Sequence, residues 1–357
     1  KLELESIEFD LWSCLAQTLK SFAPRAGQKG LELNCHVRPD VPDTLVGDPG
    51  RLRQIVVNLV GNALRFTNHG HILVTVELDH RSDHRVGLHF TVADTGVGIA
   101  PEHQSAIFEA FSQIRRRGAP DDTGGTGLGL SIVSQLTALM GGRTWLESAP
   151  GQGTTFHFTA TFGTPASIER PRTPDARELA GLRVLLADAS RFSLDAMREL
   201  LWRWDMSVGT ASDGRSALEA MSNAARSGRP YDLVIAGREL QNPDGMTLLA
   251  EIKSAPLLAA TPVILTSHAG QRGDGARCRQ LGAAAYLTKP IPPADWIETI
   301  RLSLGRPLLR RDDQGSERLV TRFPLKERRS LLRGLLSAEK PINTVVAGRT
   351  HSKPGTQ

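Results

Sequence analysis

Thr123-Gly124-Gly125-Thr126-Gly127-Leu128-Gly129-Leu130-Ser131-Ile132 is the most informative stretch of this chain, because its four glycines lead into an apolar helical pattern that runs to about Met140. Backbone N–H groups at a glycine-rich helix start bind anions, and the helix dipole favours phosphate there. No Gly-Lys-Ser/Thr follows, as a Walker A loop requires, and no clear strand precedes, as a dinucleotide-binding fingerprint requires. The stretch therefore predicts a phosphate site of another kind.

Upstream of this stretch, residues Asp48 to Thr67 carry a helical pattern. Asp48 can cap the helix, and an apolar stripe follows at spacings of three and four residues: Leu52, Ile55, Val56, Leu59 and Ala63. Beside the stripe, Asn58, Asn62 and Arg65 fall at i, i+4 and i+7. Because Asn is a mediocre helix former, an edge with two amides and a guanidinium indicates a binding role. A solvated polar edge is the alternative.

A second conspicuous stretch is a predicted strand, Val86 to Ala93, that runs into Asp94-Thr95-Gly96-Val97-Gly98-Ile99. Gly96 and Gly98 permit a tight turn and the close approach of a flat ligand. The carboxylate of Asp94 can accept a hydrogen bond from an exocyclic amine such as that of adenine. The same pattern also occurs in ordinary turns, so on its own it indicates little.

Two shorter features flank the glycine-rich stretch. Before it, Phe108 lies in a short apolar turn, and the polar run from Ser112 to Asp122 is predicted to form a lid. After it, Gly151-Gln152-Gly153-Thr154-Thr155-Phe156 is a turn that leads into an alternating strand over residues 155–161. Taken alone, this last feature predicts a hairpin turn and nothing more.

In this order and spacing, the four features resemble the catalytic, ATP-binding domain of sensor histidine kinases. That domain has the Bergerat (GHKL) fold, which gyrase and MutL-type ATPases share. The resemblance covers residues 1–163 and implies a two-layer α/β sandwich that binds ATP and Mg²⁺.

The resemblance also implies a role for each matching residue. Asn62 is the Mg²⁺ ligand, with Asn58 beside it and Arg65 near the phosphates, and these three form the catalytic set. Asp94 binds the adenine amine, and Thr155 lies near the adenine. Glycines 125, 127 and 129 hinge the lid. The complete predicted ATP site is Asn58, Asn62, Arg65, Asp94, Gly96, Gly98, Ile99, Phe108, Gly125, Thr126, Gly127, Leu128, Gly129 and Thr155.

Asn58 favours a kinase over an ATPase. Gyrase-like relatives have a glutamate four residues before the metal-binding Asn, where it acts as a general base on water. The neutral amide of Asn58 cannot take a proton at working pH, which suits transfer to a histidine imidazole better. None of the ten histidines has the helical setting of the family's phosphoacceptor. We therefore expect the acceptor on an upstream dimerisation hairpin outside this sequence.

The second half of the chain repeats a strand-then-helix rhythm. The five predicted strands are Arg183–Ala187, Ser207–Ala211, Asp232–Ala236, Pro262–Thr266 and Ala284–Leu287. Short apolar strands that alternate with helices predict a parallel sheet covered on both faces. Residues 181–305 resemble a response-regulator receiver, a doubly wound, flavodoxin-like (βα)5 domain, and residues 164–180 form the predicted linker.

The receiver departs from its family at the site of phosphorylation. Asp188, Thr266 and Lys289 fall where the family has an acid, its switch hydroxyl and its lysine, and all three would converge at the carboxyl ends of the strands. Gly237, however, stands at the position of the acceptor aspartate. The paired acid at the end of the first strand is also reduced, to Ala187 and Asp188. With two of the three carboxylates gone, Mg²⁺ binding should weaken. We expect that this domain is not phosphorylated.

Composition limits the remaining possibilities. The 357 residues carry a net charge of +5, but residues 306–357 alone carry +7, so the rest of the chain is at −2. We therefore predict no nucleic-acid binding, and we expect a basic tail that is largely disordered. The tail resembles the start of a second receiver, and a simple basic linker is the alternative. No run of apolar residues approaches the length that a membrane-spanning helix needs. Three scattered cysteines favour a reducing, cytoplasmic compartment.

The sequence thus predicts the ATP-binding catalytic part of a hybrid sensor histidine kinase, followed by a regulatory receiver. The partners implied are a dimerisation hairpin, a downstream response regulator or histidine phosphotransfer protein, and a second copy of the full-length protein. A chain that starts at Lys1 is expected to be a fragment. Two alternatives stay open: an ATP-binding interaction module without turnover, and a nucleic-acid-binding regulator, for which we find no recognition helix.

Overall fold

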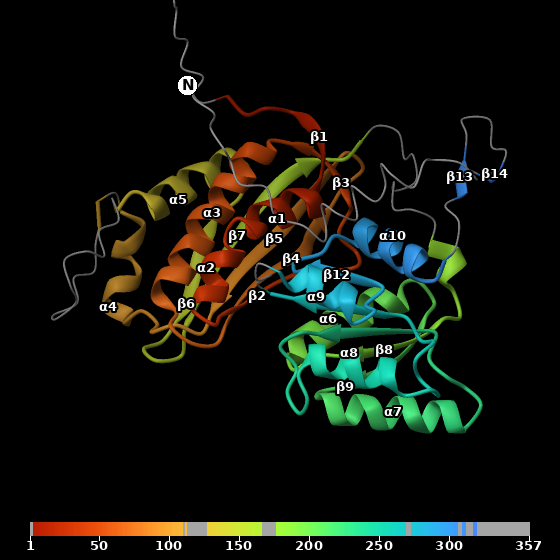
Figure 1. The fold of residues 1–357 in the computed structure, drawn as a ribbon. Helices are drawn as coiled ribbons and strands as arrows, with labels where there is room; N and C mark the ends of the chain where they lie inside the picture. The colour runs from red at the N-terminus through yellow and green to blue at the C-terminus, as the bar shows by residue number, and fades with distance from the viewer. Residues whose placement is uncertain are drawn as a thin grey trace, which may run out of the picture.

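The computed structural model describes residues 3–109, 111–112, 127–165, 176–268, 273–305, 309–311 and 317–319. Figure 1 shows two α/β domains that follow one another along the chain. In the described part of the chain, no helix combines the length and the apolar composition that a membrane-spanning helix requires.

The first domain is built on one seven-stranded sheet. Its strand order is β1-β3-β7-β5-β4-β2, with β6 paired to β7. All pairings are antiparallel except that of β2 with β4. The strands are β1 (Ile7–Asp10), β2 (Glu32–Val37), β3 (Thr44–Gly47), β4 (His71–Arg81), β5 (Arg85–Asp94), β6 (Thr144–Ser148) and β7 (Thr154–Gly163).

Helices cover one face of this sheet, as Figure 1 shows. They are α1 (Leu11–Lys20), α2 (Ala23–Gln28), α3 (Pro49–Phe66), α4 (Pro101–Gln104) and α5 (Gly129–Leu139), with a 3-10 turn at Ala106–Phe108. The two-layer sandwich predicted from the sequence is confirmed.

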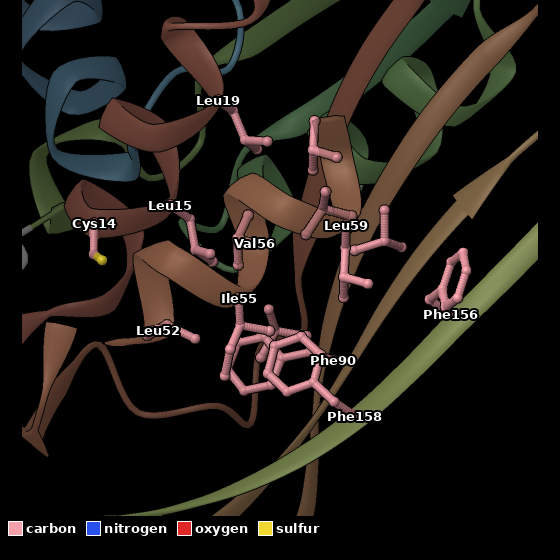
Figure 2. Close-up of a cluster of buried hydrophobic side chains, with 14 of the residues drawn as sticks. Cys14, Leu15, Leu19, Leu52, Ile55, Val56, Leu59, Phe90, Phe156 and Phe158 are labelled. Atoms are coloured by element: carbon pink, nitrogen blue, oxygen red, sulfur yellow. The ribbon is translucent and has the colours of Figure 1, made fainter. Parts of the chain in front are cut away.

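The core lies between α3 and the sheet. The apolar stripe of α3 is fully buried, and Figure 2 shows it facing the aromatic side chains of β5 and β7. The rings of Phe90 and Phe158 stack with centroids 4.5 Å apart. The side chain of Asp48 accepts a hydrogen bond from the N–H of Arg51 at 2.9 Å and so caps α3. The stripe and the cap together fix which edge of α3 carries its polar residues.

The second domain is a parallel five-stranded sheet of order β12-β11-β10-β8-β9. Alternate residues of the central strands enter two separate apolar cores, one on each face, so the predicted doubly wound fold is confirmed. The strands are β8 (Arg183–Ala187), β9 (Ser207–Ala211), β10 (Leu233–Gly237), β11 (Val263–Ser267) and β12 (Ala285–Thr288), and the helices are α6 (Arg191–Trp202), α7 (Gly214–Arg226), α8 (Gly245–Ser254), α9 (Asp274–Gln280) and α10 (Pro293–Ser303).

The segments around the second domain differ from expectation in two places. Within the predicted linker, a 3-10 turn at Ala176–Leu179 inserts Leu179 into the receiver core, so the folded receiver begins near residue 176. Within the tail, β13 (Leu309–Arg311) and β14 (Glu317–Leu319) pair antiparallel. Residues 166–175, the rest of the tail and its predicted helix lie outside the described residues.

The two domains touch where α6 of the receiver lies against β2, an edge strand of the first sheet (Figure 1). His36 Nε2 lies 3.0 Å from Glu199 Oε2, and the rings of His71 and Phe192 are 5.0 Å apart. A cavity of about 500 Å³ lies between the domains and is lined by side chains of both.

Candidate functional site: the nucleotide pocket and the receiver pocket

The phosphate end of the predicted ATP site lies between α3 and the start of α5. Asn58, Asn62 and Arg65 share the half-buried edge of α3 beside its buried stripe. A Cβ placed on Gly129, the first residue of α5, would lie 3.7 Å from Asn58 Oδ1. The structure therefore brings the amide of Asn58 next to the first turn of α5, where an anion is favoured.

The adenine end lies at the carboxyl end of β5. Asp94 is only 9% exposed, and its Oδ1 accepts a 2.8 Å hydrogen bond from the N–H of Gly96. Burial raises the pKa of the Asp94 carboxyl, and hydrogen bonds from the backbone N–H groups of Gly96 and Thr154 lower it in part. A carboxylate is an acceptor of the kind that an exocyclic amine requires.

Gly98 has a structural reason to be glycine. Its φ is +68°, and a Cβ there would lie 1.9 Å from the carbonyl oxygen of Ala149. Any side chain would therefore push apart the two loops that form this end of the site.

The register of β7 corrects one predicted site residue. Thr154 pairs directly with Asp94, whereas Thr155 pairs with Ala93. Directly paired residues point to the same face of a sheet and successive residues to opposite faces. Thr154, which is 6% exposed, thus shares the face of Asp94, and Thr155 points to the other face. Side chains alternate between the two faces of a strand. Applied to β7, this alternation could have selected Thr154 from the sequence.

The described part of the lid hinge lies against the aromatic turn before it. Phe111 N–H donates a 3.0 Å hydrogen bond to the carbonyl oxygen of Gly127, and Gly127 has a φ of +68°. Phe108 packs edge-on against Phe156, with ring centroids 6.4 Å apart, and Ile99 packs against the same core. Leu128 precedes α5 as its N-cap residue. Gly125 and Thr126 lie outside the described residues.

The pocket at the carboxyl ends of the receiver strands is closed by internal ion pairing. Lys289 Nζ lies 2.5 Å from Asp188 Oδ2 and 3.0 Å from Ser193 Oγ. A Cβ on Gly237 would lie 3.0 Å from the same Asp188 oxygen. Thr266 is paired with Gly237, and its hydroxyl donates to the carbonyl oxygen of Ala236 at 3.4 Å. The structure therefore brings together all four predicted receiver residues.

Glu239 and Ser267 lie beside this pocket, although neither is among the predicted site residues. Ser267 Oγ donates a 2.6 Å hydrogen bond to Glu239 Oε1, and the N–H of His268 donates to the same oxygen at 3.2 Å. Ser267 is thus bonded to the Glu239 carboxylate, whereas the hydroxyl of Thr266, which lines the pocket with Asp188 and Lys289, bonds back to its own sheet. Ser267 is the last residue of β11. A hydroxyl at the end of a predicted strand is the feature of the sequence that could have identified it.

Comparison with known proteins agrees with this geometry. Residues 47–164 match the model for histidine kinase-, DNA gyrase B- and HSP90-like ATPases, and residues 184–301 match the model for response regulator receiver domains. The first half is therefore a GHKL-type ATPase domain and the second a receiver domain.

Several known proteins are similar to most of this chain, across both of its domains. The signal transduction histidine-protein kinase BarA of Escherichia coli K12 is 34% identical over 82% of this chain and 31% of its own length. The sensory/regulatory protein RpfC of Xanthomonas campestris pv. campestris is 30% identical over 84% of this chain and 45% of its own. The crystal structure of full-length ShkA in complex with AMPPNP matches with a TM-score of 0.63 at 31% identity, covering 85% of this chain and 58% of that one.

By this pairing of domains, the chain belongs to the hybrid histidine kinases of two-component signalling. It spans about a third to a half of the length of the curated relatives described above.

Proposed function

We propose that this chain holds ATP and Mg²⁺ and transfers the γ-phosphate to a histidine on a dimerisation hairpin that is not part of the sequence. The observation that carries the proposal is that two ends of one pocket are built at once. Asp94 and Thr154 face the position of a base, and the edge of α3 faces the N-terminus of α5, where phosphates would lie.

The side chains present fit this chemistry. Asn62 offers an amide oxygen, a hard ligand of the kind that Mg²⁺ binds together with nucleotide phosphates. Arg65 supplies a fixed positive charge near the phosphates, and the carboxylate of Asp94 accepts from the adenine amine. Phosphoryl transfer depends mainly on positioning and charge neutralisation. The site therefore needs no general base at Asn58 when the acceptor is an imidazole.

We propose that the receiver regulates the kinase without being phosphorylated. Two observations support this. Two donors at this end of the sheet already have a carboxylate partner, because Lys289 pairs with Asp188 and Ser267 with Glu239. The pocket also faces the ATP-binding domain, since Ser193, bonded to Lys289, contacts Asn34 of β2 at 3.4 Å. Incubation with acetyl phosphate should give no mass increase on any Asp or Glu of this domain, and a stable increase would contradict the proposal.

The partners proposed are the dimerisation hairpin, a downstream response regulator or histidine phosphotransfer protein, and a second copy within a homodimer. The alternative is an ATP-binding interaction module without turnover, which the internally neutralised receiver pocket favours. The two functions differ in one assay, in which radiolabelled ATP is added to the chain together with the histidine hairpins of BarA and RpfC. Acid-labile label on a hairpin histidine supports the kinase. If the chain binds AMPPNP in a separate titration but ATP leaves no label on either hairpin, the interaction module is supported.

A further inference from the structure

The cavity between the two domains has no part in the proposed function. Its volume is about 500 Å³, within the range of about 300–1,000 Å³ that small-molecule sites occupy. The ATP-binding domain supplies one wall from α1 and β2, and the receiver supplies the other from α6 and the loop after β12. A molecule bound in this cavity would therefore contact both domains at once.

Apolar side chains form most of the wall. Trp12 of α1 and Leu33 of β2 line the cavity from the ATP-binding domain, and Met197 of α6 lines it from the receiver. Two large rings of α6 also line it although they are far from buried, since Phe192 is 48% exposed and Trp202 is 56% exposed. Aromatic surface of this kind favours a planar apolar ligand.

The charged groups of the lining leave one cation unmatched. Four cations and two carboxylates line the cavity, namely Arg38, Arg198, Arg203, Lys289, Asp195 and Glu199. Both carboxylates bond to other lining side chains, at 2.8 Å and 3.0 Å. Lys289 is neutralised by Asp188, and Arg38 lies 3.9 Å from Glu77 at the surface. In the part of the chain that the structure describes, no carboxylate pairs with Arg203.

The polar contacts across the interface show that β2 and α6 run in the same direction. Ser193 Oγ donates to Asn34 Oδ1 at 3.4 Å, and farther along both elements His36 Nε2 lies 3.0 Å from Glu199 Oε2. A step of two residues along the strand covers about 6.6 Å, and a step of six residues along the helix covers about 9 Å. The two elements therefore advance together toward one end of the interface.

At that end each domain contributes one arginine. Arg38 comes directly after β2 and Arg203 directly after α6, and both line the cavity. Two guanidinium groups at one end of a cavity repel each other. An oxyanion between them replaces this repulsion by charge-assisted hydrogen bonds. The ligand that fits this cavity therefore carries an anionic group at the arginine end and an apolar body along the wall.

We propose that the cavity between the domains binds a small planar aromatic acid, whose anionic group is held by Arg38 and Arg203 and whose rings pack against the apolar wall. Because both domains hold it, the ligand binds the docked arrangement of the receiver and stabilises that arrangement. The proposal does not depend on the binding of ATP.

The test is a fluorescence titration of the full chain with two dyes of the same ring system, anilinonaphthalenesulfonate, which is an anion, and N-phenylnaphthylamine, which is neutral. We expect the native chain to bind the anionic dye at one saturable site and more tightly than the neutral dye. Arg203→Gln and Arg38→Gln should each weaken the anionic dye about three- to tenfold, the effect of one partly exposed charge-assisted contact. Neither variant should change the affinity for the neutral dye.

Arg226→Gln is the matched control for charge, because Arg226 is an exposed arginine in the last turn of α7 that does not line the cavity. It should leave both affinities unchanged. A second pair of variants tests the space itself. Ala196→Trp places an indole in the cavity from α6 and should weaken both dyes at least about tenfold. Ala224→Trp, at an equally half-buried position of α7 outside the cavity, should weaken neither.

Three results would overturn the inference. Equal affinity of the native chain for the two dyes would show that no anion site exists. Dye affinities that are unchanged in Arg38→Gln and Arg203→Gln would show adventitious binding elsewhere on the surface, and this comparison stays decisive if Ala196→Trp does not fold. Equal weakening in Arg226→Gln and Arg203→Gln would show an effect of net charge alone.

Discussion

Asp94 combines a binding role with a cost in stability. Burial raises the pKa of its carboxyl, so the ionised form that accepts from an amine is the form that the folded domain disfavours. A raised pKa in the folded state means that the unfolded chain gives up this proton more readily. Stability is therefore lost as the pH rises from the ordinary pKa of an aspartate toward the raised value.

The variant Asp94→Asn should consequently be more stable than the native chain at pH 7 while it binds AMPPNP more weakly. The stability difference should shrink as the pH falls, because the native carboxyl then takes up its proton and becomes neutral, as the amide of the variant is. Calorimetric melting curves at several pH values measure it. A variant that melts below the native chain at pH 7 would contradict this explanation.

Gly98 and Gly151 provide a matched pair for testing the close approach of the two adenine loops. Both have positive φ, at +68° and +78°, but only at Gly98 does a Cβ meet backbone, while Gly151 has open space around it. Gly151→Ala should cost about 1–2 kcal/mol of unfolding free energy from strain alone. Gly98→Ala should cost more and abolish AMPPNP binding. If the two variants lose the same unfolding free energy in denaturation and bind AMPPNP equally well in titration, the close approach of the two loops at Gly98 is unimportant.

Single residues were the least predictable level of the structure. Thr155 was predicted where Thr154 lies, because the motif gives the spacing but not the register of β7 against β5. Likewise, Ser267 and Glu239 meet across a loop and a strand end. Only the packed sheet decides which of two neighbouring polar side chains points into a pocket.

Among the elements, α3 was the most predictable, since its cap, stripe and polar edge could all be read from the sequence. The edge strands β1 and β2, and β3 next to β1, could not, because they are short and only partly buried, and their pairing depends on distant residues. The same limit applies to the turn at Ala176–Leu179, where a single leucine anchors a polar segment.

The role of α3 as the platform of the site can be tested on the helix itself. Ile55 is fully buried, whereas Val57, two residues later, is 38% exposed. Ile55→Ala should lower the unfolding free energy of the ATP-binding domain by about 2–5 kcal/mol, through lost burial and a cavity. Val57→Ala should change it by less than about 0.5 kcal/mol. Denaturant titration measures both, and similar losses would mean that the stripe of α3 does not form the core.

At the scale of the whole molecule, the contact between α6 and β2 joins the receiver to the kinase. Burial lowers the pKa of His268 at the receiver pocket, and Glu32 of β2 is close enough to act on that pKa in the opposite direction. Along the same interface, His36 meets Glu199. The pocket that would take a phosphoryl group is thus turned toward the neighbouring domain.

Charge reversal at this interface should separate the domains. Glu199→Lys removes the carboxylate partner of His36 and places an ammonium group beside the imidazole, so the radius of gyration measured by X-ray scattering should increase. Glu219→Lys makes the same charge change on α7, away from the contact, and should leave it unchanged. Because both side chains of the pair are partly exposed, the stability of either domain should change by less than about 1 kcal/mol. Identical scattering curves for both variants would contradict the docking role.

The most direct test of the account is calorimetric titration of AMPPNP into this chain, with and without Mg²⁺, for the native protein, Asp94→Asn, Asn62→Asp and the control Asn223→Asp on α7. We predict that the native chain and the control bind and that their affinity rises with Mg²⁺. Asp94→Asn should bind at least tenfold more weakly, and Asn62→Asp should show an altered Mg²⁺ dependence. A folded native chain that binds no nucleotide, or variants that bind as the native chain does, would contradict the assignment of this pocket.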